Sequence, residues 1–171
     1  MSLAGDAGAA WGGAIYLSDA VGNFQGLVLT NSRACGGAMH VYAGYAVGKG
    51  GEAVGGGIYL AGSSSVYVGS SVLASNLAAG GVPIDYAQSG GTGGNGHGGA
   101  LFVGPGCSAA LDACLFLGNS AAGGHAGGHS WGGSGRGGAV WNGGGLQAQD
   151  STFSGNSAVG ADGAYSGNEP Y

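Results

Sequence analysis

The chain repeats one pattern of small and apolar residues four times. In each copy a Gly-Gly pair is followed by a small residue and then by a short, mostly apolar or aromatic run. Successive copies begin 43, 43 and 39 residues apart. A repeat of this length indicates a stack of equivalent units, none of which can bury its apolar face alone. The four copies are Gly12–Leu17, Gly55–Leu60, Gly98–Val103 and Gly137–Asn142.

The later units can be aligned on three asparagines, Asn76, Asn119 and Asn156. Residues at the same distance before each asparagine then occupy equivalent positions, which we call columns. Positions two apart are small or apolar in each unit, which is the period of a strand with one face turned inward. These columns are Val66/Ala109/Leu146 and Val68/Leu111/Ala148, and a third column holds Leu73, Phe116 and Phe153. The first unit fits if Gly37 takes the asparagine position, which places Leu27 and Leu29 in the paired columns and Ala34 in the third.

The pattern predicts strands and turns throughout. No window shows a sustained helical period, and the chain has 45 glycines among 171 residues. Each glycine costs about 1 kcal/mol relative to alanine inside a helix. Several parallel strands per unit, with no helix between them, predict an all-β parallel β-helix of about four turns, each about 4.8 Å above the last. We expect a single domain with repeat units 12–54, 55–97, 98–136 and 137–171.

Corresponding side chains of such a coil form ladders. One predicted ladder holds Ile15, Ile58, Leu101 and Val140, and the next holds Tyr16, Tyr59, Phe102 and Trp141. The smaller branched residues suit a narrow interior and the aromatic residues suit an outer face, although an aromatic core is the alternative. Asn76, Asn119 and Asn156 recur where the chain turns, and asparagine tolerates left-handed backbone and hydrogen-bonds to local amides, so we interpret them as structural.

Two motifs resemble a known family. The Gly-Gly-Ala-Ile motif, at Gly12–Ile15, Gly55–Ile58, Gly98–Leu101 and Gly137–Val140, is similar to repeats of polymorphic outer membrane proteins and the wider pectin-lyase-like superfamily. The Phe-x-x-Asn motif is intact at Phe116–Asn119 and Phe153–Asn156 and departs at its first residue in Leu73–Asn76. The resemblance implies a right-handed parallel β-helix. It says little about function, because the family includes adhesins, passenger domains, coat proteins and polysaccharide enzymes.

Three glycine-rich insertions separate the units, at residues 40–54, 79–97 and 122–136. Because they leave the coil at the same place in the repeat, we expect them to stack on one flank. A single loop of this composition would be flexible, since an ordered glycine loses more conformational entropy than any other residue. Stacked loops can instead approach closely. We therefore hypothesise that they hydrogen-bond to one another in extended form and roof the aromatic ladder.

Charge narrows the set of partners. Lys and Arg number 3 against 8 Asp and Glu, the net charge is −5 and the pI is about 4.9, which disfavours nucleic acid and anionic membranes. Charged residues make up 6%, far below the usual quarter, which favours an extracellular or cell-surface structural or adhesive module. No apolar run is long enough for membrane insertion, and this chain shows no signal peptide. Both ends fall within the repeat pattern, which indicates either part of a longer surface protein or end-to-end self-association into a filament.

Candidate catalytic and metal-binding residues are few. Gly96-His97-Gly98 is similar to a short piece of galacturonan hydrolases, and Asp112 and Asp150 are the strand carboxylates best placed for catalysis. The two acids are one column out of register, whereas acids that cleave glycosides must converge. The sequence therefore predicts no catalytic residue, and a pectin-lyase-like carbohydrate-active enzyme is the alternative. His125 and His129, like His40 and His97, lie in glycine-rich segments where spacing does not fix geometry, so we expect neither a metal nor another cofactor.

Aromatic loop residues are the candidates for binding. Tyr42, Tyr45, Tyr86 and Trp131, with His125 and His129 beside them, could contact a carbohydrate or a cell-surface receptor, or could pin the loops to the coil. The cysteines Cys35, Cys107 and Cys114 are odd in number, so Cys107 and Cys114 either pair or remain as buried thiols. The sequence thus favours a noncatalytic extracellular structural or adhesive module that presents glycine-rich loops.

Overall fold

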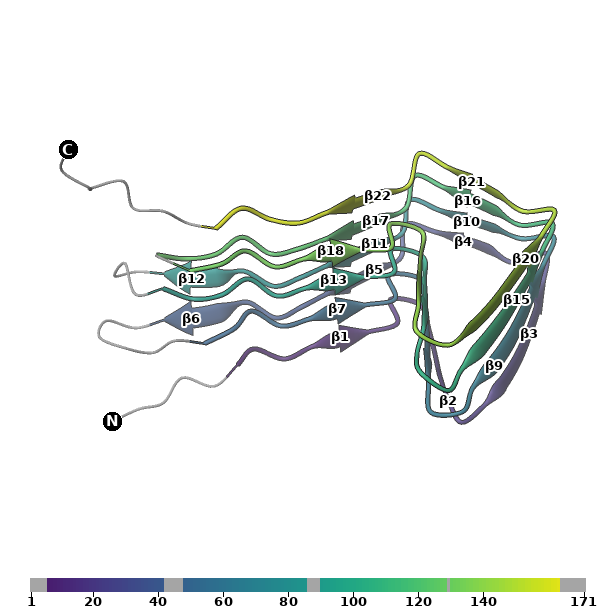
Figure 1. The fold of residues 1–171 in the computed structure, drawn as a ribbon, viewed down its shortest axis with the longest axis horizontal. Helices are drawn as coiled ribbons and strands as arrows, with labels where there is room; N and C mark the ends of the chain where they lie inside the picture. The colour runs from purple at the N-terminus through teal and green to yellow at the C-terminus, as the bar shows by residue number, and fades with distance from the viewer. Residues whose placement is uncertain (1–5, 42–47, 86–89, 129, 164–171) are drawn as a thin grey trace.

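A computed structural model of the chain describes residues 6–41, 48–85, 90–128 and 130–163. These residues contain strands and turns and no helix, and therefore none that could span a membrane. The strands stack in parallel into five sheets of four strands, with one strand of each sheet in each coil (Figure 1). The predicted parallel β-helix of four turns is confirmed.

Three sheets enclose the coil, on the right in Figure 1. Sheet B contains β2 (Ile15–Ser18), β8 (Ile58–Ala61), β14 (Leu101–Val103) and β19 (Val140–Asn142). Sheet C contains β3 (Val21–Gln25), β9 (Ser65–Gly69), β15 (Ser108–Asp112) and β20 (Gly145–Gln149). Sheet D contains β4 (Val28–Thr30), β10 (Val72–Ala74), β16 (Leu115–Leu117) and β21 (Thr152–Ser154).

The remaining sheets form a two-layered projection, which we call the glycine flange (Figure 1). The chain leaves the coil through sheet E, which contains β5 (Arg33–Cys35), β11 (Leu77–Ala79), β17 (Ser120–Ala122) and β22 (Ser157–Val159). It returns through sheet A, which contains β1 (Ala10–Trp11), β7 (Ala53–Val54), β13 (Gly96–His97) and β18 (Gly135–Arg136). Farther out, β6 (Met39–Val41) pairs with β12 (Pro83–Asp85). The insertions therefore project from one flank, as predicted.

The coil interior is filled by the aliphatic ladder. Ile58 pairs with Leu101 in register, and both side chains are fully buried. The aromatic ladder lies on the outer face of sheet B, where successive ring centroids from Tyr16 to Trp141 are 5.2, 5.1 and 4.4 Å apart. The assignment of the branched residues to the interior is therefore confirmed, and the aromatic-core alternative is wrong. Burial of these aliphatic side chains supplies the main hydrophobic stabilisation.

Other predicted columns also line the interior. Val66 with Ala109, Val68 with Leu111 and Leu73 with Phe116 are paired in adjacent coils and buried. Cys107 and Cys114 are buried free thiols, and Cys35 is an exposed one, so the disulfide alternative for Cys107 and Cys114 is wrong. Small thiols suit this tightly packed interior.

The predicted alignment of the first coil is wrong. It placed Gly37 in the asparagine column, whereas Ser32 stands beside Asn76 and its N–H donates to Asn76 Oδ1 at 3.0 Å. The left-handed residue of this turn is Asn31, with φ of 56°, matching Ser75 at 55°. Asn31 and Ser32 make the turn, so Gly37 belongs to the flange. The observed register aligns Gly22 with Val66, Phe24 with Val68, Leu29 with Leu73 and Ala34 with Ala78.

Candidate functional site

A continuous hydrogen-bond path joins the two layers of the glycine flange. Each donor lies in one layer and its acceptor in the other, so the path alternates, just beyond the strands of sheets A and E, between the outgoing and the returning layer of all four coils. The N–H groups of Gly37, Gly51, Gly81, Gly94, Gly124, Gly133 and Ala161 donate in turn to the carbonyls of Gly8, Gly37, Gly51, Gly81, Gly94, Gly124 and Gly133, at 2.8 to 3.0 Å. The predicted hydrogen bonding between stacked loops is confirmed.

Gly-Gly pairs allow this close approach. In Gly80-Gly81, a Cβ on Gly80 would collide with the carbonyl of Gly94 in the opposite layer. A Cβ on Gly81 would collide with the carbonyl of Gly37 in the neighbouring coil of the same layer. The same two constraints apply to Gly93-Gly94 and to Gly123-Gly124. Glycine is therefore required for packing in two directions, and the flange is an ordered plate rather than a set of independent loops.

The flange does not roof the aromatic ladder, contrary to our hypothesis. It touches the ladder at its root, where Trp11 stacks on Tyr59 with centroids 6.2 Å apart and His97 meets the edge of Trp141 at 6.0 Å. Tyr16 remains 50% exposed. The chain enters and leaves the flange at a sharp corner, so the plate extends away from sheet B instead of folding over it (Figure 1).

Of the six predicted binding residues, the structure describes Trp131 and His125. Tyr42, Tyr45, Tyr86 and His129 lie outside the described residues. Trp131 is 81% exposed and His125 is also exposed, both on the flange. Their roles in binding stay predictions. In the described ranges, no group of three or more His, Cys, Asp or Glu side chains is placed to hold a metal ion.

A polar column crosses the root of the flange. Lys49 Nζ lies 2.7 Å from Glu52 Oε1, which also accepts a hydrogen bond from Asn95 Nδ2 at 3.1 Å. The hydrogen bond and charge of Lys49 lower the pKa of Glu52, although partial burial opposes this shift. His97 Nδ1 is buried without a hydrogen-bond partner, and burial lowers the pKa of His97. The contacts among Lys49, Glu52 and Asn95 therefore have a structural role in flange packing.

The two candidate carboxylates remain in different columns. Asp112 pairs in register with Gln149, so Asp150 lies one position farther along the neighbouring coil. Asp112 Oδ2 accepts a hydrogen bond from the Tyr67 hydroxyl at 3.1 Å, and Asp150 Oδ2 lies 3.4 Å from Gln149 Nε2. His97 belongs to sheet A, away from sheet C. Each of the two carboxylates therefore has its own local partner, and His97 lies in another sheet, so the three do not share a catalytic centre.

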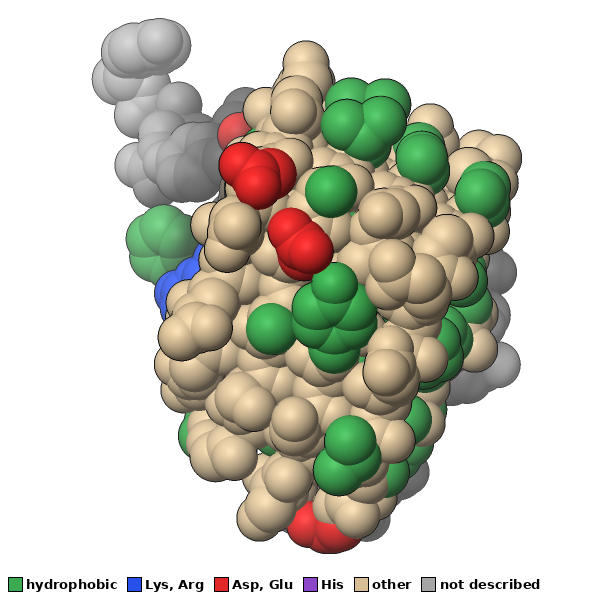
Figure 2. All heavy atoms as spheres, turned by 90° about the vertical axis from the view of Figure 1, so that its right-hand side faces the viewer, with side chains coloured by type: hydrophobic (Ala, Val, Ile, Leu, Met, Phe, Trp, Pro, Cys, Tyr) green, Lys and Arg blue, Asp and Glu red, His purple; other side chains and the backbone are tan. Residues whose placement is uncertain are grey.

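The outer face of sheet C carries a hollow that the sequence reasoning missed. It has a volume of about 580 Å³ and crosses all four strands of the sheet. Figure 2 shows that this side of the molecule is mainly uncharged, with acidic groups in small separate areas. The lining is neutral and includes side chains from every coil: Val21, Asn23, Ser65, Tyr67, Ser108, Ala110, Leu146 and Gln147.

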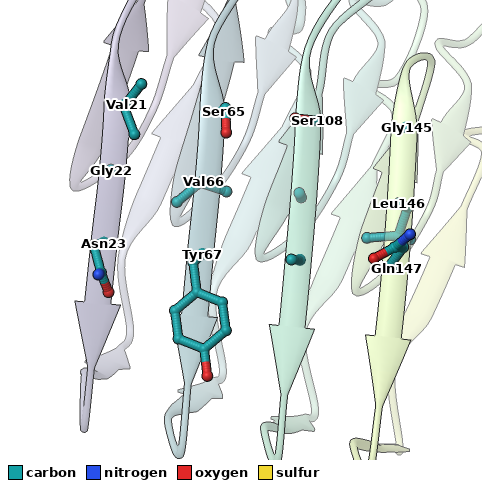
Figure 3. A pocket seen from close by; sticks show the side chains of 12 residues that line it. Val21, Gly22, Asn23, Ser65, Val66, Tyr67, Ser108, Gly145, Leu146 and Gln147 are labelled. Atoms are coloured by element: carbon teal, nitrogen blue, oxygen red, sulfur yellow. The ribbon is translucent and has the colours of Figure 1, made fainter.

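Tyr67 is the largest outward-facing group in this hollow. Its ring extends along β9 (Figure 3) toward Gly69, where an added Cβ would first meet Gln25 Oε1 and would lie 2.7 Å from the tyrosine Oη and 2.8 Å from Cε1. The hydrogen bond to Asp112 raises the pKa of Tyr67 above its ordinary value of 10.0, because ionisation would place two negative charges together. Side chains alternate between the two faces of a strand, so the inward Val66 and Val68 place Tyr67 on the outer face. This alternation is the sequence feature from which the direction of Tyr67 could have been predicted.

No protein-family model, curated protein or solved structure matches this chain.

Proposed function

We propose that this chain is a noncatalytic structural or adhesive module of an extracellular surface, built to hold the glycine flange away from the coil. The observation that carries this proposal is the interlayer hydrogen-bond path, which orders a segment whose composition would otherwise favour flexibility. A plate of this kind displays its tip and faces at a fixed distance and orientation. Such display serves attachment or spacing between surfaces.

The neutral surface supports the same proposal. Only 6% of the residues are charged, and the two carboxylates best placed for catalysis occupy separate columns with neutral partners. Glycoside cleavage by paired acids requires convergence on one bond. The alternative of a pectin-lyase-like enzyme therefore has weaker support than a surface module. The resemblance to polymorphic outer membrane protein repeats agrees with a surface role.

The end coils favour contact with further coils. Phe153 in the last coil stacks on Phe116 at 4.7 Å, and it is 45% exposed whereas Phe116 is fully buried between coils. Another coil of the same kind would cover this ring and pair with the outer strand edges. We include end-to-end contact between modules in the proposal, whether the next coil belongs to the same polypeptide or to a second copy.

Hydrogen exchange tests the order of the flange. The amides of Gly81, Gly94 and Gly124 should exchange slowly because they donate across the two layers. The Gly118 amide, which donates to Ser154 in the coil, provides an internal reference. Flange amides that exchange at the rate of an unstructured peptide would contradict the proposed role as a rigid plate.

A product assay tests the noncatalytic part. The chain is incubated with acidic and neutral polysaccharides, and new reducing ends and unsaturated products are measured. We expect no turnover. Turnover that is lost in Asp112→Asn or Asp150→Asn would overturn the proposal in favour of the enzyme. Electron microscopy and sedimentation of the same preparation measure end-to-end association.

A further inference from the structure

The hollow on sheet C combines a flat aromatic ring with neutral hydrogen-bonding groups. Tyr67 lies along its strand toward Gly69, so one ring face is turned toward the sheet and the other toward solvent (Figure 3). The hydroxyl donates a hydrogen bond to Asp112, which restricts rotation of the side chain about the Cα–Cβ bond. A ring fixed in this way loses little conformational entropy on binding.

The register places hydrogen-bonding groups on both sides of this ring. Asn23, Tyr67, Ala110 and Gln147 form one row across the four strands. Ala110 has a small side chain, so it leaves space beside the ring. The amides of Asn23 and Gln147 each supply donors and an acceptor. A ligand that runs across the strands would meet an amide, an aromatic face, a shallow space and a second amide in turn.

The absence of charged residues from the lining of the hollow favours a neutral ligand over an anionic one. Every residue that lines it is neutral, and the nearest carboxylate that the structure links to it is Asp112 through Tyr67. An anionic polymer would find no cation among the lining residues and would be repelled by Asp112. A neutral sugar chain offers hydroxyl groups to the amides and the apolar face of a sugar ring to the tyrosine.

The aromatic ladder of sheet B does not offer the same platform. Tyr16 and Tyr59 stack at 5.2 Å, and Phe102 and Trp141 stack at 4.4 Å with an interplanar angle of 4°. The faces of these rings are therefore occupied largely by one another, and the ladder presents edges to solvent. Tyr67 differs because its neighbours in register are Asn23 and Ala110, neither of which is aromatic.

We propose that the outer face of sheet C binds a neutral polysaccharide that crosses its strands, with one sugar ring stacked on Tyr67. This inference rests on the proposed noncatalytic surface role and adds a ligand class and a site. The ligand is defined by its chemistry as an uncharged, hydroxyl-rich chain.

Affinity electrophoresis of the whole chain tests the site. The gels contain a soluble mixed-linkage β-glucan, a galactomannan or a xylan, and polygalacturonate serves as the acidic probe. At least one neutral polymer should retard the chain more than polygalacturonate does. Tyr67→Ala should weaken that retardation constant about tenfold, the size expected for one aromatic contact. Tyr67→Phe, which keeps the ring, should change it less than Tyr67→Ala does.

Two more variants distinguish a loss of binding at this site from a general effect on the fold. Gly69→Ala adds a Cβ that would press on the Gln25 amide and on the tip of the Tyr67 ring, so it should displace the ring and reduce retardation while the ring is still present. Tyr16→Ala removes a half-exposed tyrosine on sheet B and should leave retardation unchanged. Thermal unfolding of each variant confirms that it is folded at the assay temperature.

The outcomes distinguish the two proposals. Retardation by a neutral polymer that depends on Tyr67 and Gly69, without cleavage, supports the site. Absence of retardation by every neutral polymer, preference for polygalacturonate, or equal loss in Tyr67→Ala and Tyr16→Ala would overturn it and leave the structural role standing. Cleavage of a retained polymer would overturn the noncatalytic role instead.

Discussion

Asn119 receives two hydrogen bonds from Asn76 on one oxygen. Its Oδ1 lies 3.0 Å from the backbone nitrogen of Asn76 and 3.0 Å from Asn76 Nδ2. The Asn119 Nδ2 donates to the Leu73 carbonyl at 2.8 Å and to Asn156 Oδ1 at 2.9 Å. Asparagine at this position therefore connects three coils through groups that are buried from water.

We expect Asn119→Ala to lower the free energy of unfolding by about 3 kcal/mol, because it leaves the Asn76 N–H and the Leu73 carbonyl without their partners in a buried site. Urea denaturation measures the change. Asn142→Ala is the matched control, since exposed Asn142 accepts from the Gly144 N–H at 3.1 Å near the surface. Equal stability losses in the two variants would contradict a structural role specific to the buried ladder.

Gly81→Ala should destabilise the flange by about 1–3 kcal/mol, since the new Cβ would collide with the Gly37 carbonyl and the backbone must shift. Faster exchange of the Gly94 amide, which donates to Gly81, would report the local effect. Gly160→Ala serves as the control because the nearest atom to its Cβ is 3.7 Å away. If both variants behave like the unmodified chain, the close packing we describe is incorrect.

Acidification should destabilise the chain partly through His97. Burial lowers the pKa of His97 below its usual 6.5, so the unfolded chain binds a proton more readily and stability falls as the pH drops through this region. Glu52, whose pKa is lowered by Lys49, adds a further loss below its usual 4.5. The measurement is the melting temperature between pH 8 and pH 5. His97→Gln should reduce the pH dependence of the melting temperature, and an unchanged pH dependence in this variant would contradict the role given to His97.

Cys114→Ser should change the free energy of unfolding by no more than about 1 kcal/mol. Serine already stands in this column, as Ser151, whose Oγ accepts from the Cys114 N–H at 3.0 Å. The Cys114 Sγ lies 3.1 Å from the Val68 carbonyl, which a serine hydroxyl can use as an acceptor. Thermal unfolding tests this expectation, and a loss comparable to that of Asn119→Ala would refute it. Mass spectrometry under non-reducing conditions should find Cys107 and Cys114 unpaired.

Several features of the fold could be predicted because they repeat at one interval. Ile58 and Leu101 are 43 residues apart, stand in register and are buried, as the spacing of the Gly-Gly motifs indicated. The first glycine of each motif has φ between 63° and 66°, a conformation that glycine adopts without steric cost. In the first coil the prediction failed, because Ser32 replaces asparagine and no local feature distinguishes it from other serines.

The candidate sites could not be predicted in the same way. Tyr67, Gly69 and Asp112 come from two coils, and their relationship depends on which way each strand turns its side chains. The hollow that they border is a property of four strands together. Trp131 and His125 were predicted as binding residues from their place in a loop, and the structure shows both exposed on the flange, which leaves that prediction open.

The sequence by itself determined the number of coils and, from the second coil onward, the ladders inside them and the asparagine turns, because in-register stacking requires like residues at a constant interval. Only the tertiary structure decided that the insertions become a two-layered plate and that the Tyr67 ring extends toward Gly69. The physical reason is that the plate depends on approach between chain segments about one coil apart, and the position of the Tyr67 ring depends on a hydrogen bond to Asp112 of the next coil. That approach is set by the hydrogen-bond register and by the space that absent side chains leave, as between Gly81 and Gly37.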